Sequence, residues 1–319
     1  MNLTFENPVY LWYLASIPLL VLTHFLSLRM AKRKAMRFAN FQTLKRIAGE
    51  RLVTKNVSVL IFRVLTVALL VLAASGVRMW YKAPQSDNNY VIGLDVSSSM
   101  SAKDFSPDRL ETAKSYAKEF VDTLNERTKA GVVTFAGVTM IEQTLTDDKA
   151  AVKSSIDRVQ LTQTGGTDMP GALITATNML LSDSDGGKVF ILFTDGSSTL
   201  GNFIDGSLDQ ATEYAVEHKV VVNGVGIGTE SAPIGYLPEY YNISSVFGLD
   251  NLRLITNRTS GVTIPASEEQ DLEAAYVDLL KRSDESLVDV RLDLMFLVAG
   301  LLLLFIEWGL INSRYRRVA

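Results

Sequence analysis

The stretch VIGLDVSSSM, residues 91–100, joins an apolar run to an aspartate and three consecutive serines. The run 90–94 predicts a short strand that is buried on both faces. Asp95 ends this strand, and Ser97 and Ser99 follow at alternate positions, so an extended loop would turn both hydroxyls toward one point beside the carboxylate. Because serines after a strand also form ordinary turns, this stretch alone indicates either a turn or a metal site.

The composition indicates that part of the chain lies in lipid. Of its 319 residues 47% are hydrophobic, which is high for a soluble protein. Three apolar stretches explain the excess, at 9–28, 57–77 and 294–311, and each is about long enough to cross a ~30 Å hydrocarbon core. The first has no positively charged n-region and no small-residue cleavage site after it, so we expect it to remain as an anchor. The sequence predicts two N-terminal transmembrane helices and one C-terminal helix.

Basic residues set the expected orientation of these helices. The loop 29–56 carries a single acidic residue, Glu50, against a group of basic residues: Arg29, Lys32, Arg33, Lys34, Arg37, Lys45, Arg46, Arg51 and Lys55. The tail 312–319 adds Arg314, Arg316 and Arg317. Since positively charged loops stay in the cytoplasm, we expect the loop and the tail to be cytoplasmic and residues 78–293 to face outward.

The outward segment is acidic and lacks thiols. Residues 82–293 contain 17 Lys and Arg against 32 Asp and Glu, a formal charge of −15. Nucleic acid is an unfavourable ligand for such a surface. The chain has no cysteine, which excludes disulfides, thiolate catalysis and cysteine-based zinc sites.

Strand and helix patterns alternate along this segment. Short apolar runs at 90–94, 131–135, 189–193 and 220–225 predict strands, and helical periodicity predicts helices from Leu110 to Leu124, at 170–181 and at 268–281. This alternation is typical of an α/β fold with a doubly wound, mostly parallel sheet. The chain is expected to divide into two spans with their basic loop (1–80), an outer domain (82–290), a third span (294–311) and a basic tail (312–319).

Two further motifs would reach the carboxyl edge of this sheet, where ligands bind in doubly wound folds. Thr167 lies in TGGTDM just before a predicted helix, and Asp195 ends a strand in ILFTDG. Together with Asp95, Ser97 and Ser99 they form an all-oxygen set. Such a set suits magnesium or manganese better than zinc, which prefers histidine or cysteine.

The three separated pieces, DxSxS at Asp95, Ser97 and Ser99, GGTD at Thr167 and TDG at Asp195, resemble the metal ion-dependent adhesion site of von Willebrand factor A domains. The resemblance implies that the hydroxyls contact Mg²⁺ or Mn²⁺ and that the aspartates act directly or through water. It also implies that one coordination position is left for an acidic side chain of a partner.

A second resemblance covers nearly the whole chain. The segment ENPVYLWYLASIPLL, the motifs SPDRLETAK and GVVTFAG, and the terminal spans are similar to those of bacterial Bat, or aerotolerance-operon, proteins of the BatA and BatB type. This implies an inner-membrane protein with a periplasmic A domain that works with cytoplasmic MoxR-type AAA+ ATPases and other Bat-like A-domain proteins. The segment after Gly228 departs from the family in being longer and more aromatic, with Tyr236, Tyr240, Tyr241 and Phe247. Those aromatic residues would either contact a partner or pack on their own domain.

Three other aspartates near the motifs have plainer interpretations. Asp168 is expected to cap a helix. Asp104 and Asp108 are also expected to cap the helix that follows them, with contact to metal-bound water as the alternative.

Charged residues within the spans need partners, because such groups are costly in lipid. His24, Arg63 and Glu307 fall at similar depths. We expect Arg63 to pair with Glu307, the alternative being that each side chain extends to the headgroups.

Enzymatic function is not expected. The DVS loop is similar to an aspartyl-phosphate loop but has serine where the second aspartate should be, neither histidine has a serine to activate, and no Walker motif is present. Two function classes remain. One is a metal-dependent adhesion or assembly module that binds an acidic residue of an envelope protein. The other is a structural subunit of a membrane assembly or transport complex, in which the loop 29–56 receives an ATPase.

Overall fold

The computed structural model describes residues 2–36, 57–84, 88–162, 166–183, 186–196, 205–229, 231–233, 244–246, 248–266, 277 and 285–313. The chain forms two compact units. One unit comprises Met1–Tyr81 with Asp289–Ala319, and the other comprises Lys82–Val288.

A six-stranded sheet forms the centre of the second unit. Its strands lie in the order β10-β7-β6-β3-β4-β5, and their bounds are β3 Asn88–Asp95, β4 Ala130–Phe135, β5 Thr139–Thr146, β6 Gly187–Thr194, β7 Val221–Ile227 and β10 Thr263–Ala266. All neighbouring pairs are parallel except β4 and β5. The expected doubly wound, mostly parallel sheet is confirmed.

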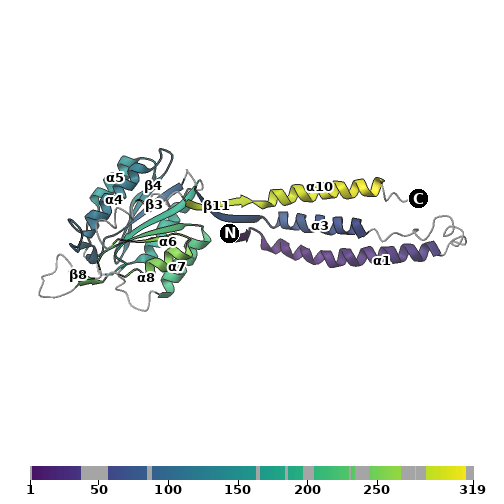
Figure 1. Ribbon diagram of the computed structural model, residues 1–319, viewed down its shortest axis with the longest axis horizontal. Coiled ribbons are helices and arrows are strands. Elements are labelled where there is room, and N and C mark those ends of the chain that lie inside the picture. The colour runs from purple at the N-terminus through teal and green to yellow at the C-terminus, as the bar shows by residue number, and fades with distance from the viewer. Residues whose placement is uncertain are drawn as a thin grey trace. The chain divides into compact units, whose positions relative to one another are not determined.

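Helices cover both faces of this sheet (Figure 1). On one face α4 (Arg109–Thr123) and α5 (Lys149–Arg158) pack on alternate strand residues such as Ile92 and Ile191. On the other face α6 (Met169–Leu181), α7 (Asp205–Glu217) and α8 (Asp250–Arg258) pack on the residues between them, such as Val91 and Phe190. Because successive side chains of a strand point to opposite faces of the sheet, one apolar run contributes residues to both hydrophobic cores.

The predicted strands agree with β3, β4, β6 and β7. The edge strand β10 was not predicted, and neither was the opposite edge strand, β5. Its residues are largely exposed, with Met140 and Ile141 among them, so it lacks the apolar run by which a buried strand is recognised. The predicted helices from Leu110 and at 170–181 correspond to α4 and α6. The helix predicted at 268–281 lies outside the described residues, apart from Val277.

The winding direction of the sheet reverses between β3 and β6. From β3 the chain moves through α4 to β4 on one side, and it later returns to β6 on the other side. In doubly wound sheets this reversal of direction is where ligands bind. Asp95 ends β3, and Asp195 follows directly after β6.

The first unit contains three helices that are long and apolar enough to cross a membrane, over Pro8–Met30, Val57–Ala74 and Leu292–Asn312. They are formed by the 3-10 helix η1 (Pro8–Ala15) with α1 (Ser16–Met36), by α3 (Val57–Ala74) and by α10 (Leu292–Ser313). The three predicted apolar helices are confirmed. The second helix ends earlier than predicted, because Gly76 turns the chain with a φ of 65° and a strand begins at Val77.

A small sheet joins the helix ends within this part of the chain. It has the order β1-β2-β11, with β1 at Asn2–Phe5, β2 at Val77–Pro84 and β11 at Glu285–Arg291. Arg78 of β2 forms ion pairs with Glu6 and with Asp289 of β11, the latter at 2.8 Å.

The predicted ion pair between Arg63 and Glu307 is confirmed. Arg63 donates from Nε at 2.8 Å and from Nη2 at 2.5 Å to Oε1 of Glu307. α3 and α10, which carry the two residues, pack against each other. The pair therefore joins two of the three apolar helices.

Candidate metal centre

Asp95 occupies the carboxyl end of β3 and is fully buried. Its Oδ1 accepts a hydrogen bond from the backbone N–H of Ser97 at 2.9 Å, and its Oδ2 accepts one from Oγ1 of Thr194 at 2.7 Å. Asp95 is thus fixed between its own loop and the end of the neighbouring strand.

Ser97 and Ser99 bring their hydroxyls together, as their spacing predicts, with 3.0 Å between the two Oγ atoms. The loop is not the expected extended one. Ser97 is extended, and residues Ser98–Ser101 then form the short 3-10 helix η3. Because both serines are nearly buried, their hydroxyls form a compact pair of neutral oxygen donors beside Asp95.

Asp195 begins the loop after β6 and is also fully buried. Thr194, the last residue of β6, links the two loops, because its hydroxyl donates to Asp95 and accepts from the backbone N–H of Gly196 at 3.0 Å. This role of Thr194 was not predicted from the sequence, although the residue directly precedes Asp195 in the TDG motif.

Thr167 lies buried at the same edge of the sheet. The next residue, Asp168, donates its backbone N–H to the carbonyl of Ala136. Ala136 directly follows β4, and the carbonyl of Phe135 accepts from the N–H of Val96 at 2.9 Å. The chain at Thr167 is therefore attached to the loops that carry the first three predicted ligands.

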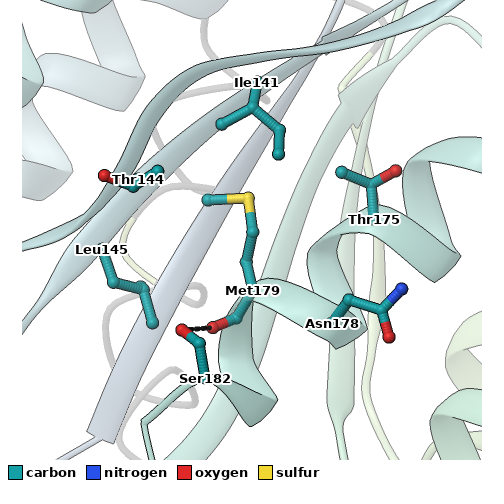
Figure 2. Close-up of a pocket in the computed structure, with 7 residues that line it drawn as sticks. All are labelled: Ile141, Thr144, Leu145, Thr175, Asn178, Met179 and Ser182. Atoms are coloured by element: carbon teal, nitrogen blue, oxygen red, sulfur yellow. Dashed lines mark hydrogen bonds between the residues drawn. The ribbon is translucent and has the colours of Figure 1, made fainter.

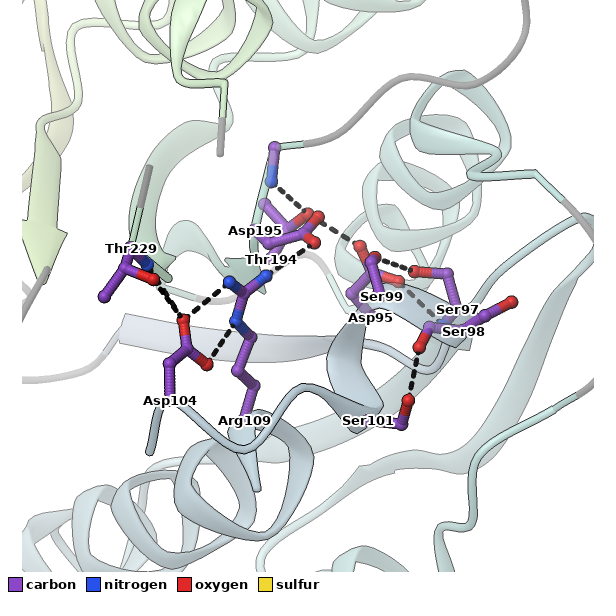
Figure 3. A network of polar contacts seen from close by, with 11 residues as sticks. Asp95, Ser97, Ser98, Ser99, Ser101, Asp104, Arg109, Thr194, Asp195 and Thr229 are labelled. Carbon is purple, nitrogen blue, oxygen red and sulfur yellow. Dashed lines mark hydrogen bonds and ion pairs between the residues drawn. The ribbon is translucent and has the colours of Figure 1, made fainter. Parts of the chain in front are cut away.

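Arg109 enters the site from α4 and is completely buried (Figure 3). Its Nη1 donates to Oδ2 of Asp195 at 3.0 Å. Its Nε and Nη2 form a two-pronged contact with Asp104, at 2.8 and 2.6 Å. This fork geometry is characteristic of arginine with a carboxylate.

Asp104 is therefore not a helix cap, as the sequence suggested, but a partner of Arg109. It also accepts hydrogen bonds from the N–H and Oγ1 of Thr229, both at 2.9 Å. The other expected caps are confirmed: Asp108 accepts from Glu111 N–H at the start of α4, and Asp168 accepts from Gly171 N–H at the start of α6.

The position of Arg109 in the sequence indicates that its side chain pairs with an anion. Arg109 is the first residue of α4, where the helix dipole disfavours a positive charge. A cation at that position indicates a nearby anion that outweighs the dipole. Its partner Asp195 lies 86 residues away in the sequence, so the identity of the anion could not be inferred.

The carboxylates outnumber the basic group in this network. Asp95, Asp195 and Asp104 with Arg109 carry a formal charge of −2, and Asp104 has only 9% of its side chain exposed. Burial, with repulsion from Asp195 added, raises the pKa of Asp95 to about 7, although hydrogen bonds from Ser97 and Thr194 oppose the rise. Burial also acts to raise the pKa of Asp104, but hydrogen bonds from Arg109 and Thr229 outweigh it and hold that pKa below its usual value.

A divalent cation matches this charge and the oxygen donors. Within the described residues, no group of three or more His, Cys, Asp and Glu side chains is placed to hold a metal. A cation between Asp95 and Asp195 would therefore need the hydroxyls of Ser97, Ser99 and Thr167 to complete its shell. Hard cations such as Mg²⁺ accept such neutral oxygens together with one or two carboxylates.

A separate hollow of about 450 Å³ lies between β5 and α6 (Figure 2). Its lining carries no charged side chain and consists of Ile141, Thr144, Leu145, Thr175, Asn178, Met179 and Ser182. It shares no residue with the network around Asp95.

Both the N-terminal part of the chain and the sheet domain match models of known protein families. Residues 90–197 match the model of the von Willebrand factor type A domain, and residues 1–76 match that of the aerotolerance regulator N-terminal domain. A UPF0353 protein of Nocardia farcinica is 28% identical over 93% of this chain and 95% of its own length. A UPF0353 protein of a Mycobacterium species is 26% identical over 86% of this chain and 84% of its own.

Solved structures share the fold of the second unit. BatB from Bacteroides thetaiotaomicron is 25% identical, with a TM-score of 0.53, and the match covers 61% of this chain and 98% of that one. Proximal thread matrix protein 1 from the mussel byssus, described with a zinc-occupied metal ion-dependent adhesion site, is 22% identical, with a TM-score of 0.53, over 72% of this chain and 54% of that one.

Proposed function

We propose that this chain, a membrane-associated von Willebrand factor A protein of the Bat family, is an adhesion and assembly module that binds an acidic side chain of an envelope protein through a divalent cation. Asp95, Ser97, Ser99, Thr167 and Asp195 would hold the cation, which is Mg²⁺ or Mn²⁺. The chain acts as a binding protein and not as an enzyme.

The observation that carries this proposal is the buried, unbalanced network of three carboxylates around one arginine. Buried charges are stable only when they are paired or coordinate a metal, and a dication cancels the formal charge of −2. Arg109 already occupies one oxygen of Asp195. A cation that relies largely on hydroxyls keeps part of its positive charge, and a carboxylate from outside would complete its shell.

The related fold of the mussel protein supports this kind of ligand, since that protein is described with zinc at its metal ion-dependent adhesion site. In the present chain the five proposed ligands are all oxygen donors, which favours a harder cation than zinc.

We further propose that the chain lies in the bacterial inner membrane, with the A domain on the periplasmic side and the loop 29–56 in the cytoplasm. The basic character of that loop supports this orientation, although residues 37–56 lie outside the described part of the chain. Alkaline phosphatase fused after residue 82 should be active, and an inactive fusion would reverse the orientation.

The partners we propose follow from the family and from this orientation. A MoxR-type AAA+ ATPase would act from the cytoplasm on the basic loop, together with other Bat-like A-domain proteins in the membrane. In the periplasm an envelope protein would offer the carboxylate. The two kinds of partner would then meet different surfaces of the chain.

The test is affinity capture of the full-length protein from native membranes, followed by mass spectrometry, with Mg²⁺, with chelator, and as Asp195→Ala. Asp168→Asn is the matched control, because asparagine also caps a helix. Proteins that are lost with chelator and with Asp195→Ala, but retained by the control, are the expected result. An identical set of proteins in every sample would contradict the proposal.

A further inference from the structure

Thr229 and Gly248 are both connected to Asp195, Gly248 directly and Thr229 through Asp104 and Arg109. Thr229 follows β7, and Gly248 precedes α8. The segment between them lies in the stretch after Gly228 that carries Tyr236, Tyr240, Tyr241 and Phe247. Both ends of this segment are therefore connected to a proposed metal ligand, one directly and one through two side chains.

The attachment of Thr229 runs through two side chains. Oδ2 of Asp104 accepts both hydrogen bonds from Thr229, each 2.9 Å long, and Asp104 is held in turn by the fork of Arg109. The third nitrogen of that guanidinium reaches Asp195 at 3.0 Å. Arg109 is fully buried, so water does not screen this connection.

The attachment of Gly248 is direct. Its N–H donates to the backbone carbonyl of Asp195 at 3.2 Å. Gly196, the next residue, has a φ of +71°, and a Cβ built on it would lie 1.8 Å from the carbonyl oxygen of Gly248. Only glycine allows the two segments to approach so closely.

A hairpin lies between these two attachments. β8 (Ser231–Pro233) pairs antiparallel with β9 (Ser244–Val246), and Ser231 lies opposite Val246. The chain is thus anchored on both sides of this strand pair, at Thr229 to Asp104 and at Gly248 to the backbone of Asp195.

We propose that Arg109 is a positioning residue that couples occupation of the metal site to the β8–β9 hairpin. The inference rests on the proposed function, because it requires a cation at Asp195. Without the cation, a single guanidinium offsets the charges of Asp104 and Asp195 beside the buried Asp95. With the cation, Asp195 is fixed, and Arg109 and Asp104 hold Thr229 while the carbonyl of Asp195 holds Gly248.

A lysine cannot replace arginine in this role. The guanidinium has donors in a rigid plane, so it can bind both oxygens of Asp104 and one oxygen of Asp195 together. An ammonium group keeps the charge but not the fork. Arg109→Lys should therefore still bind the cation when Mg²⁺ is saturating, but with the connection to the hairpin broken.

The experiment is hydrogen–deuterium exchange of the full-length protein in detergent, with Mg²⁺ and with chelator, read at 229–233 and 244–248. In the wild-type chain Mg²⁺ should slow exchange there about fivefold or more. In Arg109→Lys the slowing, read at Mg²⁺ concentrations that saturate the site, should fall below about twofold, while the Mg²⁺ dissociation constant, measured by calorimetry, rises by no more than about 10–100-fold. Lys118→Gln, which removes an exposed charge from the same helix, is the control and should respond as wild type does.

Thr229→Val provides a second variant that leaves the arginine and all carboxylates in place. It removes one of the two hydrogen bonds to Asp104 and should reduce the slowing at 229–233 to about half. It serves as the decisive variant if Arg109→Lys does not fold.

The outcomes separate the two proposals. A wild-type chain that binds no Mg²⁺ would reject the metal site and the coupling with it. A wild-type chain that binds Mg²⁺, with equal slowing in wild type, Arg109→Lys and Thr229→Val, would reject the coupling alone.

Discussion

Arg63 and Arg109 differ in how their charge is balanced. Arg63 meets one carboxylate, Glu307, between two apolar helices. Arg109 meets two carboxylates, Asp104 and Asp195, while Asp95 lies close enough to Asp195 for the repulsion between them to help raise its pKa. The first arrangement is neutral and the second has an excess of negative charge.

This difference in charge balance distinguishes an ion pair that stabilises helix packing from a group of side chains that can bind a cation. A neutral pair in an apolar environment satisfies both partners and fixes two helices side by side. An excess of buried carboxylates is stable only if a bound cation or a bound proton offsets part of the negative charge. The comparison therefore predicts that cations affect the network around Arg109 and leave the pair at Arg63 unchanged.

The largest expected effect is that of Asp95→Asn on cation binding. Loss of outer-shell groups commonly weakens metal binding by about 10–100-fold, so loss of a proposed charged ligand should reach or exceed the upper end of that range. Calorimetry with Mg²⁺ on the full-length protein measures it. Asp168→Asn should bind as wild type does, and an unchanged affinity in Asp95→Asn would place the cation elsewhere.

The pair at Arg63 should show strong coupling but no response to Mg²⁺. Arg63→Leu and Glu307→Leu each leave a charge without its partner, whereas the double variant leaves none. We expect a coupling free energy of about 1–3 kcal/mol in a double-mutant cycle of unfolding in detergent micelles. Additive single effects would show that the pair contributes no stability.

Cation binding should weaken as the pH falls below about 7. The pKa of Asp95 is raised from 3.8 to about 7, so below that pH a proton must leave before the cation binds. The Mg²⁺ dissociation constant should rise by about tenfold per pH unit there. Calorimetry between about pH 5.5 and about pH 8 checks this slope, and a flat profile would contradict the buried position of Asp95.

The raised pKa of Asp95 also makes the free energy of unfolding of the cation-free chain depend on pH. In chelator the folded chain retains the Asp95 proton up to about pH 7, while the unfolded chain loses it near 3.8. The free energy of unfolding should therefore decrease as the pH rises between these values, and Mg²⁺ should restore it. Thermal unfolding at several pH values, with and without Mg²⁺, measures both trends.

The smallest effect is expected from Asp108→Ala. Asp108 lies near Asp104 in the sequence but only caps α4. Its loss should lower the free energy of unfolding by about 1 kcal/mol and leave the Mg²⁺ affinity unchanged. A large loss of affinity would mean that the network extends beyond Arg109 and its carboxylates.

The sequence predicted the parts of the fold that depend on local pattern. β3, β4, β6 and β7 are short apolar runs buried on both faces, and this pattern is visible without any partner. β5 was missed because an edge strand needs no such run, and the strands β1, β2 and β11 were missed because each is stabilised by residues far away in the sequence.

The residues of the candidate site also fall into those that local spacing predicts and those that depend on partners far away in the sequence. Asp95, Ser97 and Ser99 are brought together by one short loop, so their spacing was informative. Thr194 and Arg109 reach the site through partners 99 and 86 residues away, which sequence spacing cannot reveal. Arg63 and Glu307 lie 244 residues apart, yet their pairing was predictable because the apolar helices fix the depth of each residue.

The most direct test of the account is the number of Mn²⁺ ions bound by the full-length wild-type protein, counted by electron paramagnetic resonance. The unbalanced network predicts one bound Mn²⁺ per chain that Mg²⁺ displaces and that is absent from Asp95→Asn. A wild-type chain without bound Mn²⁺, or equal binding by Asp95→Asn, would contradict the claim that these carboxylates form a cation site.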